Sequence, residues 1–335
     1  MKRQKITLEE IAEYSNLLLA VYKASKAKKH RKIVQSFLNN LENKLLILSN
    51  DILSGKLPYG RFKAFQIYDP KKRMIHAACF EDRVFLHAVM NIAGDRIEKG
   101  MIYHSYACRK EKGVHKAVNQ VQKNLQRYKW FVKIDIKAYF SCINHDCLLN
   151  ILSHCYKGSA FLAQLKRIIK SCPEMQDKGL PIGSLTSQYF ANYYLDGLDR
   201  LLANDQHVNA NIRYMDDVIW WCETKAEAKQ MLAKVVSYLK DERMLMVKPS
   251  LQILPSHAGV SYCGFRISQG AIRLSHRRKK SINLKRQYWE QQYIDQTITS
   301  NQLQMAYAAI HAISQGTDSL AWRQKQLREK PPINV

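Results

Sequence analysis

Two adjacent carboxylates interrupt an otherwise apolar, β-rich stretch of the sequence near residue 216. Residues 211–215 and 217–221 are rich in the branched and aromatic side chains typical of strands, and they meet at Met215-Asp216. A hairpin that only needs to turn would carry Asn-Gly or Asp-Gly at this point, because those residues adopt the backbone angles of a tight turn. Asp216 and Asp217 repel each other instead, which costs stability. The stretch therefore predicts a β-hairpin whose acidic pair serves a function.

A third carboxylate lies at the end of another strand. Residues 130–136 alternate, so that Val132, Ile134 and Ile136 share one face and Lys133 and Asp135 share the other. A divalent cation would relieve the repulsion among three such acids, and Mg²⁺ takes one or two carboxylates together with substrate phosphates. Alone, an Asp-Asp pair is more often a solvated turn, so the surrounding motifs must decide between the two interpretations.

The charge of the chain indicates a polyanionic partner. Lys and Arg number 53 against 28 Asp and Glu, which gives a formal net charge of +25 over 335 residues. This excess is larger than solubility requires, and it favours nucleic acid. The basic residues concentrate in two blocks, residues 23–32 and 273–286, that flank a less basic middle and suggest a groove. A length of this order predicts about two domains with a large core.

Several other classes of protein are disfavoured. No hydrophobic run approaches the ~20 residues of a membrane span, and Glu9, Glu10 and Glu13 interrupt any signal-peptide core, so we expect a cytoplasmic protein that does not enter a membrane. The eight cysteines include no C-x-x-C pair. Zinc binding is an alternative for one cluster, although its spacing fits no usual ligand pattern and reduced structural thiols are favoured. That cluster consists of Cys142, His145, Cys147, His154 and Cys155.

Secondary structure can be outlined from the same patterns. Thr7 and Glu10 form a capping box at the start of a helix, and apolar residues from Leu38 to Ile52 recur at helical spacing up to Gly55. Residues 65–68 and 73–76 predict a hairpin with a basic turn, and a buried helix is expected after residues 181–184. A helix over about 224–242 and a strand pair over 260–267 follow.

The order of these motifs, with Tyr214-Met215-Asp216-Asp217 in a hairpin, resembles that of reverse transcriptases from about Tyr68 to Ile267. Asp82-Arg83 with His87, and residues 105–109, resemble the finger motifs of bacterial members related to group II introns. The resemblance implies an α+β right hand made of fingers, a palm with an antiparallel sheet, and a helical thumb. The implied parts are an N-terminal helical segment at 1–57, fingers at 58–130, the first palm strand at 131–140, a fingers–palm connection at 141–180, palm at 181–267, and a thumb with a C-terminal basic segment at 268–335.

The resemblance also implies a two-metal site for nucleotidyl transfer. Two Mg²⁺ ions, or Mn²⁺ in their place, would lie about 3.5–4 Å apart and be held by Asp135, Asp216 and Asp217 with the carbonyl of Ile136. Deoxynucleotide triphosphates would contact Lys71, Arg73, Phe140, Ile182, Gly183, Gln188 and Lys248. Phe140 stands where the family carries the aromatic residue that excludes a 2′-hydroxyl, although ordinary core packing remains an alternative for it. Template and product would contact Arg109, Tyr214, Met215, Gly264, Phe265, Arg277, Arg278, Lys279 and Lys280.

Residues 182–188 depart from the usual pattern of the family. Most members carry Gln-Gly there, whereas this chain reads Ile182-Gly183 and later Ser187-Gln188. This variant resembles the reverse transcriptases of diversity-generating retroelements, whose cDNA carries mutations at template adenines and diversifies a target gene. The lineage implies bacterial or phage-encoded enzymes, a retroelement template RNA, a cDNA/RNA hybrid, and an accessory variability determinant protein that forms a helical ring. Alternatively, Ile182 only packs.

Two further functions compete with this interpretation. The chain would be a retron-like or defence-associated reverse transcriptase if Ile182 did not distinguish the diversity-generating lineage from these other groups. It would be a non-catalytic RNA-binding protein on a polymerase scaffold if the acids were inactive. Retention of all three aspartates argues against the second alternative, because an inactive site would gain stability by losing them.

Overall fold

The computed structural model of the chain describes residues 2–55, 59–68, 72–172, 175 and 177–333. The chain forms two compact units, and each is made of three separate stretches. The first unit consists of Met1–Arg109, Ile136–Leu201 and Lys234–Pro249. The second consists of Lys110–Asp135, Leu202–Ala233 and Ser250–Val335. The division falls directly after Asp135, so the candidate acids all belong to the second unit.

The first unit begins with short helices that pack against a long one. These are α1 (Leu8–Ala12), α2 (Tyr14–Ser25), α3 (Lys32–Asn39), α4 (Leu41–Leu53) and α5 (Phe80–Gly100). The predicted capping box starts α1, where the Thr7 side chain accepts a hydrogen bond from the Glu10 amide and Glu10 accepts one from the Thr7 amide. The single helix predicted from Leu38 is wrong at its start, because the backbone breaks at Asn40 between α3 and α4.

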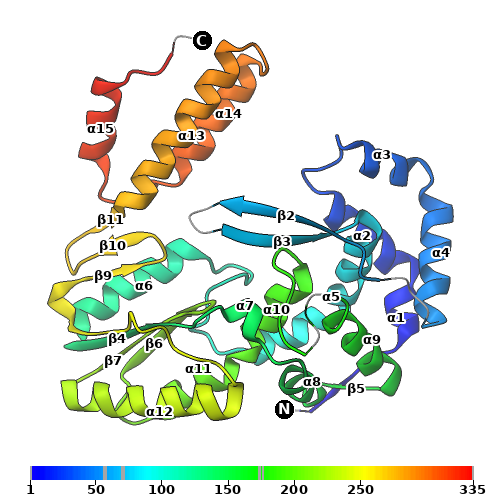
Figure 1. Cartoon of the computed structure of the whole chain (residues 1–335), viewed down its shortest axis with the longest axis horizontal. Helices are drawn as coiled ribbons and strands as arrows, with labels where there is room; N and C mark the ends of the chain where they lie inside the picture. Colours follow the sequence, from blue (N-terminus) through cyan, green and yellow to red (C-terminus); the bar gives the residue numbers. More distant parts are fainter. Residues whose placement is uncertain (1, 56–58, 69–71, 173–174, 176, 334–335) are drawn as a thin grey trace. The chain divides into compact units, whose positions relative to one another are not determined.

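The predicted basic hairpin is confirmed in the first unit. Strands β2 (Phe62–Tyr68) and β3 (Lys72–Ala78) pair antiparallel, with Phe62 opposite Ala78 and Tyr68 opposite Lys72 (Figure 1). Lys71, predicted to contact the triphosphate, lies outside the described residues. Short strands β1 (Gln4–Lys5) and β5 (Tyr156–Lys157) pair in parallel. Among the described residues, four further helices lie entirely in this unit, namely α7 (Tyr139–Cys142), α8 (His145–Ser153), α9 (Ser159–Ile169) and α10 (Leu185–Tyr194).

The second unit contains a four-stranded antiparallel sheet in the order β6-β7-β4-β8. Its strands are β4 (Trp130–Asp135), β6 (Ala210–Tyr214), β7 (Asp217–Cys222) and β8 (Gln252–Pro255). Successive residues of a strand point to opposite faces, so the complete burial of both Trp220 and Trp221 means that β7 is covered on both sides. Helix α6 (Val114–Arg127) contacts β6. Helices α11 (Asp196–Asn204) and α12 (Lys225–Arg243) each contribute residues to both units.

A smaller sheet and three helices form the C-terminal part of the second unit. Strands β9 (Val260–Tyr262), β10 (Phe265–Ile267) and β11 (Ile272–Leu274) pair antiparallel. The predicted strand pair over 260–267 is thus confirmed, and β11 was not foreseen. The 3₁₀ turn η1 (Ser256–Ala258) precedes β9. Helices α13 (His276–Ile294), α14 (Ser300–Ala312) and α15 (Leu320–Glu329) follow (Figure 1). No helix in the described part of the chain combines the length and the apolarity needed to cross a bilayer.

The cysteines and histidines weighed for zinc binding have other contacts. The Cys155 thiol donates to the Tyr193 hydroxyl at 2.8 Å, and His145 Nε2 lies 2.6 Å from the Gly179 carbonyl oxygen. Cys147 Sγ lies 3.5 Å from the carbonyl of Glu242. Burial raises the pKa of the Cys155 thiol, which keeps it protonated.

Candidate functional site

The acidic hairpin is built as the sequence predicts, with Met215 and Asp216 connecting β6 to β7. Tyr214 and Asp217 are opposite each other where the two strands end. Met215 has a φ of 57°, a left-handed conformation that costs an L-residue energy and is often found where function requires it. The guanidinium of the fully buried Arg213 donates a hydrogen bond to the Met215 carbonyl at 3.1 Å. Arg213 therefore helps to hold the turn that carries Asp216.

The β4–β7 pairing brings the third acid to the same end of the sheet. Asp135 and Asp217 are direct cross-strand partners in the antiparallel register. The Cβ atoms of directly opposite residues lie about 4.5–5.5 Å apart in such a pair. Asp135, Asp216 and Asp217 are all partly exposed to solvent. Asp135 at the end of β4 and the Asp216-Asp217 pair at the β6–β7 turn therefore lie at the same end of the sheet.

The pKa of Asp217 is set by its burial and by the charged side chains around it. Burial raises the pKa of Asp217 to about 7, and the negative charges of Asp135 and Asp216 act in the same direction. Lys133 opposes the rise, because its Nζ lies 3.2 Å from Asp217 Oδ1. Lys133 is on the same face of β4 as Asp135, since residues two apart in a strand share a face. The hydroxyl of Tyr262 donates to the Asp217 backbone carbonyl at 3.0 Å and fixes the start of β7.

The chemistry of the three acids fits a divalent cation, since carboxylate oxygens are the ligands that Mg²⁺ prefers. Burial is the main cause of the raised pKa of Asp217, and a cation would remove the smaller contribution that comes from repulsion by Asp135 and Asp216. In this conformation no three His, Cys, Asp or Glu side chains of the described residues are grouped as a metal site. Asp217 instead forms an ion pair with Lys133. A cation bound here would therefore have to compete with that ammonium group.

In the first unit, the Ile182-Gly183 turn lies against the basic hairpin. The amide of His76 in β3 donates to the Ile182 carbonyl at 3.3 Å. Gly183 has a φ of 103°, and a Cβ there would lie 3.2 Å from Ile75 Cγ2, so a side chain would be strained and crowded. Arg73 pairs with Ile67 across the same hairpin. The structure therefore brings together β3 and the turn, two of the segments predicted to contact the nucleotide.

Other residues predicted to contact the nucleotide are also in the first unit. Ile136, fully buried, forms an isolated antiparallel bridge with Val247, the residue before the half-buried Lys248. The half-buried ring of Phe140 packs edge-on against Tyr139 at 5.7 Å between centroids. Gln188 is on α10 and partly exposed.

Arg109 does not fit its predicted role as a nucleic-acid contact. Its side chain is only 8% exposed, and its Nε lies 2.8 Å from Glu98 Oε1. The same guanidinium donates to the backbone carbonyls of Ile102, Ser105 and Glu98. These bonds use four of the five N–H donors of a nearly buried side chain, so Arg109 stabilises the segment that follows α5.

Phe265 is also corrected by the structure, because it is fully buried and cannot stack on a base. Instead it supports Arg278, whose Cζ lies 4.1 Å from the Phe265 ring centroid. Arg278 also donates to the Cys263 carbonyl at 3.0 Å. Gly264 makes this arrangement feasible, since a Cβ at that position would lie 2.5 Å from Arg278 Nε. Gly264, Phe265 and Arg278 thus form one supporting contact in the second unit.

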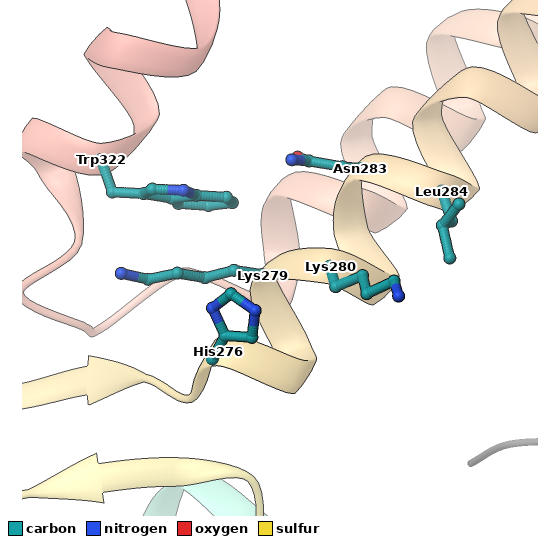
Figure 2. A pocket seen from close by; sticks show the side chains of 6 residues that line it. All are labelled: His276, Lys279, Lys280, Asn283, Leu284 and Trp322. Carbon is teal, nitrogen blue, oxygen red and sulfur yellow. The ribbon is translucent and has the colours of Figure 1, made fainter.

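A basic pocket with an aromatic wall lies between α13 and α15. Figure 2 shows the side chain of Lys279 extended beneath the Trp322 indole, and the lysine Nζ is 5.6 Å from that ring's centroid. The pocket has a volume of about 450 Å³ and is lined by His276, Lys279, Lys280, Asn283, Leu284 and Trp322. The two lysines were predicted to bind nucleic acid; His276 and Trp322 were not. Tryptophan in a basic C-terminal segment is a usable sequence signal, but it does not distinguish Trp322 from Trp289.

Asp216, Asp217, Asp135 and strand β3 of the basic hairpin all lie within the stretch that matches a known family. Residues 68–267 match the sequence pattern of the family described as reverse transcriptase (RNA-dependent DNA polymerase). The chain belongs to the reverse transcriptase family.

Several proteins similar to this reverse transcriptase are named as intron proteins. It is 24% identical over 152 residues to the putative COX1/OXI3 intron 2 protein of Saccharomyces cerevisiae, a match that covers 43% of this chain and 17% of that protein. It is 25% identical over 173 residues to protein YkfC of Escherichia coli, covering 47% of this chain and 45% of YkfC. The chain thus spans less than half the length of these curated relatives.

Solved structures confirm the predicted fold of the reverse transcriptase. Telomerase from Candida tropicalis in complex with the TWJ fragment of telomeric RNA superposes with a TM-score of 0.51 at 11% identity, covering 81% of this chain and 55% of that one. The apo telomerase gives a TM-score of 0.50 at 12% identity, with 64% and 48% covered. At this identity the likeness concerns the fold alone, an α+β polymerase fold with an antiparallel sheet.

Sequence reasoning missed two residues of the acidic site, Lys133 and Arg213. The alternation of side chains along β4 places Lys133 on the same face as Asp135. This pattern could have indicated a positive charge near that acid. Its ion pair with Asp217 depends on the β4–β7 register, which one sequence does not provide. In the sequence, nothing distinguishes Arg213 from other charged residues. The structure shows that it is buried and that it donates a hydrogen bond to the turn.

Proposed function

We propose that this chain is an RNA-directed DNA polymerase that uses two Mg²⁺ ions, or Mn²⁺, for nucleotidyl transfer. The observation that carries the proposal is the convergence of Asp135, Asp216 and Asp217 at one end of the antiparallel sheet, within the family-matched stretch. These carboxylates would hold the ions, with the Ile136 carbonyl as a further ligand. Bound Mg²⁺ lowers the pKa of the primer hydroxyl and stabilises the charge of the triphosphate.

The remaining residues have supporting roles in this proposal. Arg73 and Lys71 would bind the triphosphate, a task suited to the planar guanidinium of arginine. Phe140 would pack under the sugar and select deoxynucleotides, and Lys248 would face the leaving pyrophosphate. We assign the basic hairpin to the fingers, the four-stranded sheet to the palm and α13–α15 to the thumb. The half-buried Lys279, the exposed Lys280 and the Trp322 ring beside them are suited to phosphates and bases of template and product.

Within the family, we propose the role of a diversity-generating retroelement enzyme. Ile182 supports this, because its carbonyl is used by His76 and its side chain has no group that can hydrogen-bond a nascent base pair. The active site would then select the incoming nucleotide less strictly by the geometry of its base pair with a template adenine. The partners in this role are a retroelement template RNA, its cDNA hybrid and a ring-forming accessory variability determinant protein, in the cytoplasm of a bacterial host.

Deep sequencing of cDNA tests this role. The protein is supplied with its neighbouring accessory protein and noncoding RNA, and Ile182→Gln and Asp217→Asn are run beside it. We expect substitutions concentrated at template adenines, fewer of them in Ile182→Gln, and no cDNA from Asp217→Asn. Faithful cDNA from the unaltered protein would indicate a retron-like or defence enzyme instead. The absence of cDNA from an assembled complex would indicate a non-catalytic RNA-binding protein.

A further inference from the structure

A cavity of about 390 Å³ lies among the three C-terminal helices of the second unit, α13, α14 and α15. Each helix lines it with residues three or four positions apart, which share one face of a helix. They are Ile282 and Arg286 on α13, Tyr307 and Ile310 on α14, and Arg323 and Leu327 on α15. The volume is within the range of small-molecule sites in proteins, about 300–1,000 Å³.

The surface of this cavity is almost entirely apolar, although several polar residues contribute to its lining. Ile282 is buried, and Tyr307 and Ile310 are half-buried. Trp322 extends from α15 toward α13 and lines this cavity as well as the basic pocket of Figure 2. A water molecule needs about two to four polar partners to be held in a cavity, so such walls favour an apolar occupant.

Two leucines of α15 line the cavity and are nevertheless largely exposed. Leu320 is 58% exposed and Leu327 is 53% exposed, and they lie two turns apart on one face of the helix. No residue of α15, all of which the structure describes, is fully buried. An apolar ligand in the cavity would remove these leucines from water, which is favourable.

Arg323 gives the cavity a positive charge that the described residues do not neutralise. Its Nη1 donates to Ser314 Oγ at 3.3 Å, no carboxylate of the described residues pairs with it, and no described lining residue is Asp or Glu. Arg286 differs, because Glu290 Oε1 accepts from its Nε at 2.7 Å and from the Tyr307 hydroxyl at 2.7 Å. Arg323 thus has further N–H donors for an anion.

We propose that this cavity binds an amphipathic carboxylate, with its alkyl chain between α13, α14 and α15 and its carboxylate group at Arg323. A guanidinium fits the two oxygens of a carboxylate in a bidentate manner. A cationic amphiphile would bring its charge beside Arg323, and an uncharged one would not use the guanidinium, so the anion is favoured. The site uses none of the three aspartates and does not depend on the proposed polymerase activity.

Isothermal titration calorimetry of the full chain with octanoate, decanoate and dodecanoate, each below its micelle-forming concentration, tests the proposal. We expect saturable binding to one site, and the affinity should rise by up to about fourfold for each added CH₂ group that is buried. Arg323→Gln should weaken dodecanoate binding about tenfold and leave dodecanol binding unchanged. Arg328→Gln is the matched control, because it removes the same charge from an exposed residue of α15 that does not line the cavity.

Two further variants locate the ligand and separate binding from folding. Dodecanoate that is brominated on its alkyl chain quenches the fluorescence of an indole in contact with it. We therefore expect quenching in the unaltered protein and much less in Trp322→Phe, which should still bind the probe. Leu327→Gln should weaken the binding of dodecanoate and dodecanol alike, while the melting temperature of the ligand-free protein stays unchanged because this side chain is exposed.

Equal affinity of Arg323→Gln and Arg328→Gln for dodecanoate would overturn the proposal, and so would binding of dodecyltrimethylammonium as tight as that of dodecanoate. Binding to phosphatidylglycerol vesicles without saturable binding of dodecanoate would also overturn it and assign the exposed leucines to a membrane surface. Asp217→Asn should bind dodecanoate normally, so failure of the polymerase proposal would remain distinguishable.

Discussion

Lys133 Nζ lies 3.2 Å from Asp217 Oδ1 and provides a positive charge within a cluster of three carboxylates. The ion pair connects adjacent strands, β4 and β7, whose register also places Asp135 opposite Asp217. Both side chains are about one-fifth exposed, so the pair is partly screened by water. The acidic site is thus partly neutralised by the protein itself in the absence of metal.

Replacing Lys133 with Met should destabilise the metal-free protein. Asp217 would then be left beside Asp135 and Asp216 without a counter-charge, and we expect the free energy of unfolding to fall by about 1–2 kcal/mol. Added Mg²⁺ should restore part of this loss, because it replaces the missing charge. Urea titrations with and without Mg²⁺ measure both effects. The exposed Lys63→Met is the control, and an equal loss in both variants would contradict the assignment.

Gly264→Ala should disrupt the support of Arg278. The residue has a φ of 81°, and the added Cβ would lie 2.5 Å from Arg278 Nε. We expect a loss of about 1–2 kcal/mol in the free energy of unfolding, from backbone strain and a displaced guanidinium. Gly316→Ala is the matched control, because Gly316 also has a positive φ, 68°, and its Cβ would enter open space. Equal thermal stability of the two variants would show that Arg278 moves aside without cost.

His87 should make stability depend on pH in the acid range. Its folded pKa of about 4 is below the ordinary 6.5, so the unfolded chain binds the proton more readily. The stability that His87 contributes is therefore present above pH 6.5 and is lost as the pH falls toward 4. Compared with His87→Gln, the unaltered protein should lose on the order of 1–2 kcal/mol more over this interval, since water reaches part of the ring.

Urea titrations at several pH values in phosphate-free buffer check this dependence. Parallel curves for the two proteins between pH 4 and 6.5 would mean that His87 titrates normally when the protein is folded.

Trp322→Ala should weaken binding of single-stranded RNA. The indole forms a wall of the pocket in Figure 2, beside Lys279. Stacking of a base on an aromatic ring contributes about 1–3 kcal/mol, so a loss of roughly tenfold in affinity is expected. Fluorescence anisotropy measures it, and Trp322→Phe should retain most of the affinity. Unchanged binding by the alanine variant would remove this pocket from the nucleic-acid surface.

The sequence predicted local elements well because their causes are local. The capping box at Thr7, the hairpin ending at Asp216-Asp217 and the basic hairpin depend on neighbouring residues. The break between α3 and α4 was missed, since Asn40 interrupts an apolar spacing that would also suit one helix. Periodicity alone does not locate such a break.

Roles that depend on distant contacts were the least predictable. Arg109 and Phe265 belong to segments that resemble functional motifs, yet burial and partners distant in sequence give both a structural role. The pairing of Lys133 with Asp217 likewise requires a strand register. The sequence alone was sufficient to select the three acids as candidates. Arg213, which bonds to the turn, and Lys133, which pairs with Asp217, could be recognised only from the folded structure.

Mg²⁺-dependent incorporation of deoxythymidine monophosphate on a poly(rA)/oligo(dT) substrate tests the central claim most directly. We predict that the unaltered protein extends the primer and that Asp135→Asn and Asp217→Asn each lower the rate at least about 100-fold. Asp241→Asn, an exposed acid bonded to Ser237, should retain full activity. Extension by Asp217→Asn at the rate of the unaltered protein, or none by an unaltered protein that binds the substrate, would contradict the assignment of these carboxylates to DNA synthesis.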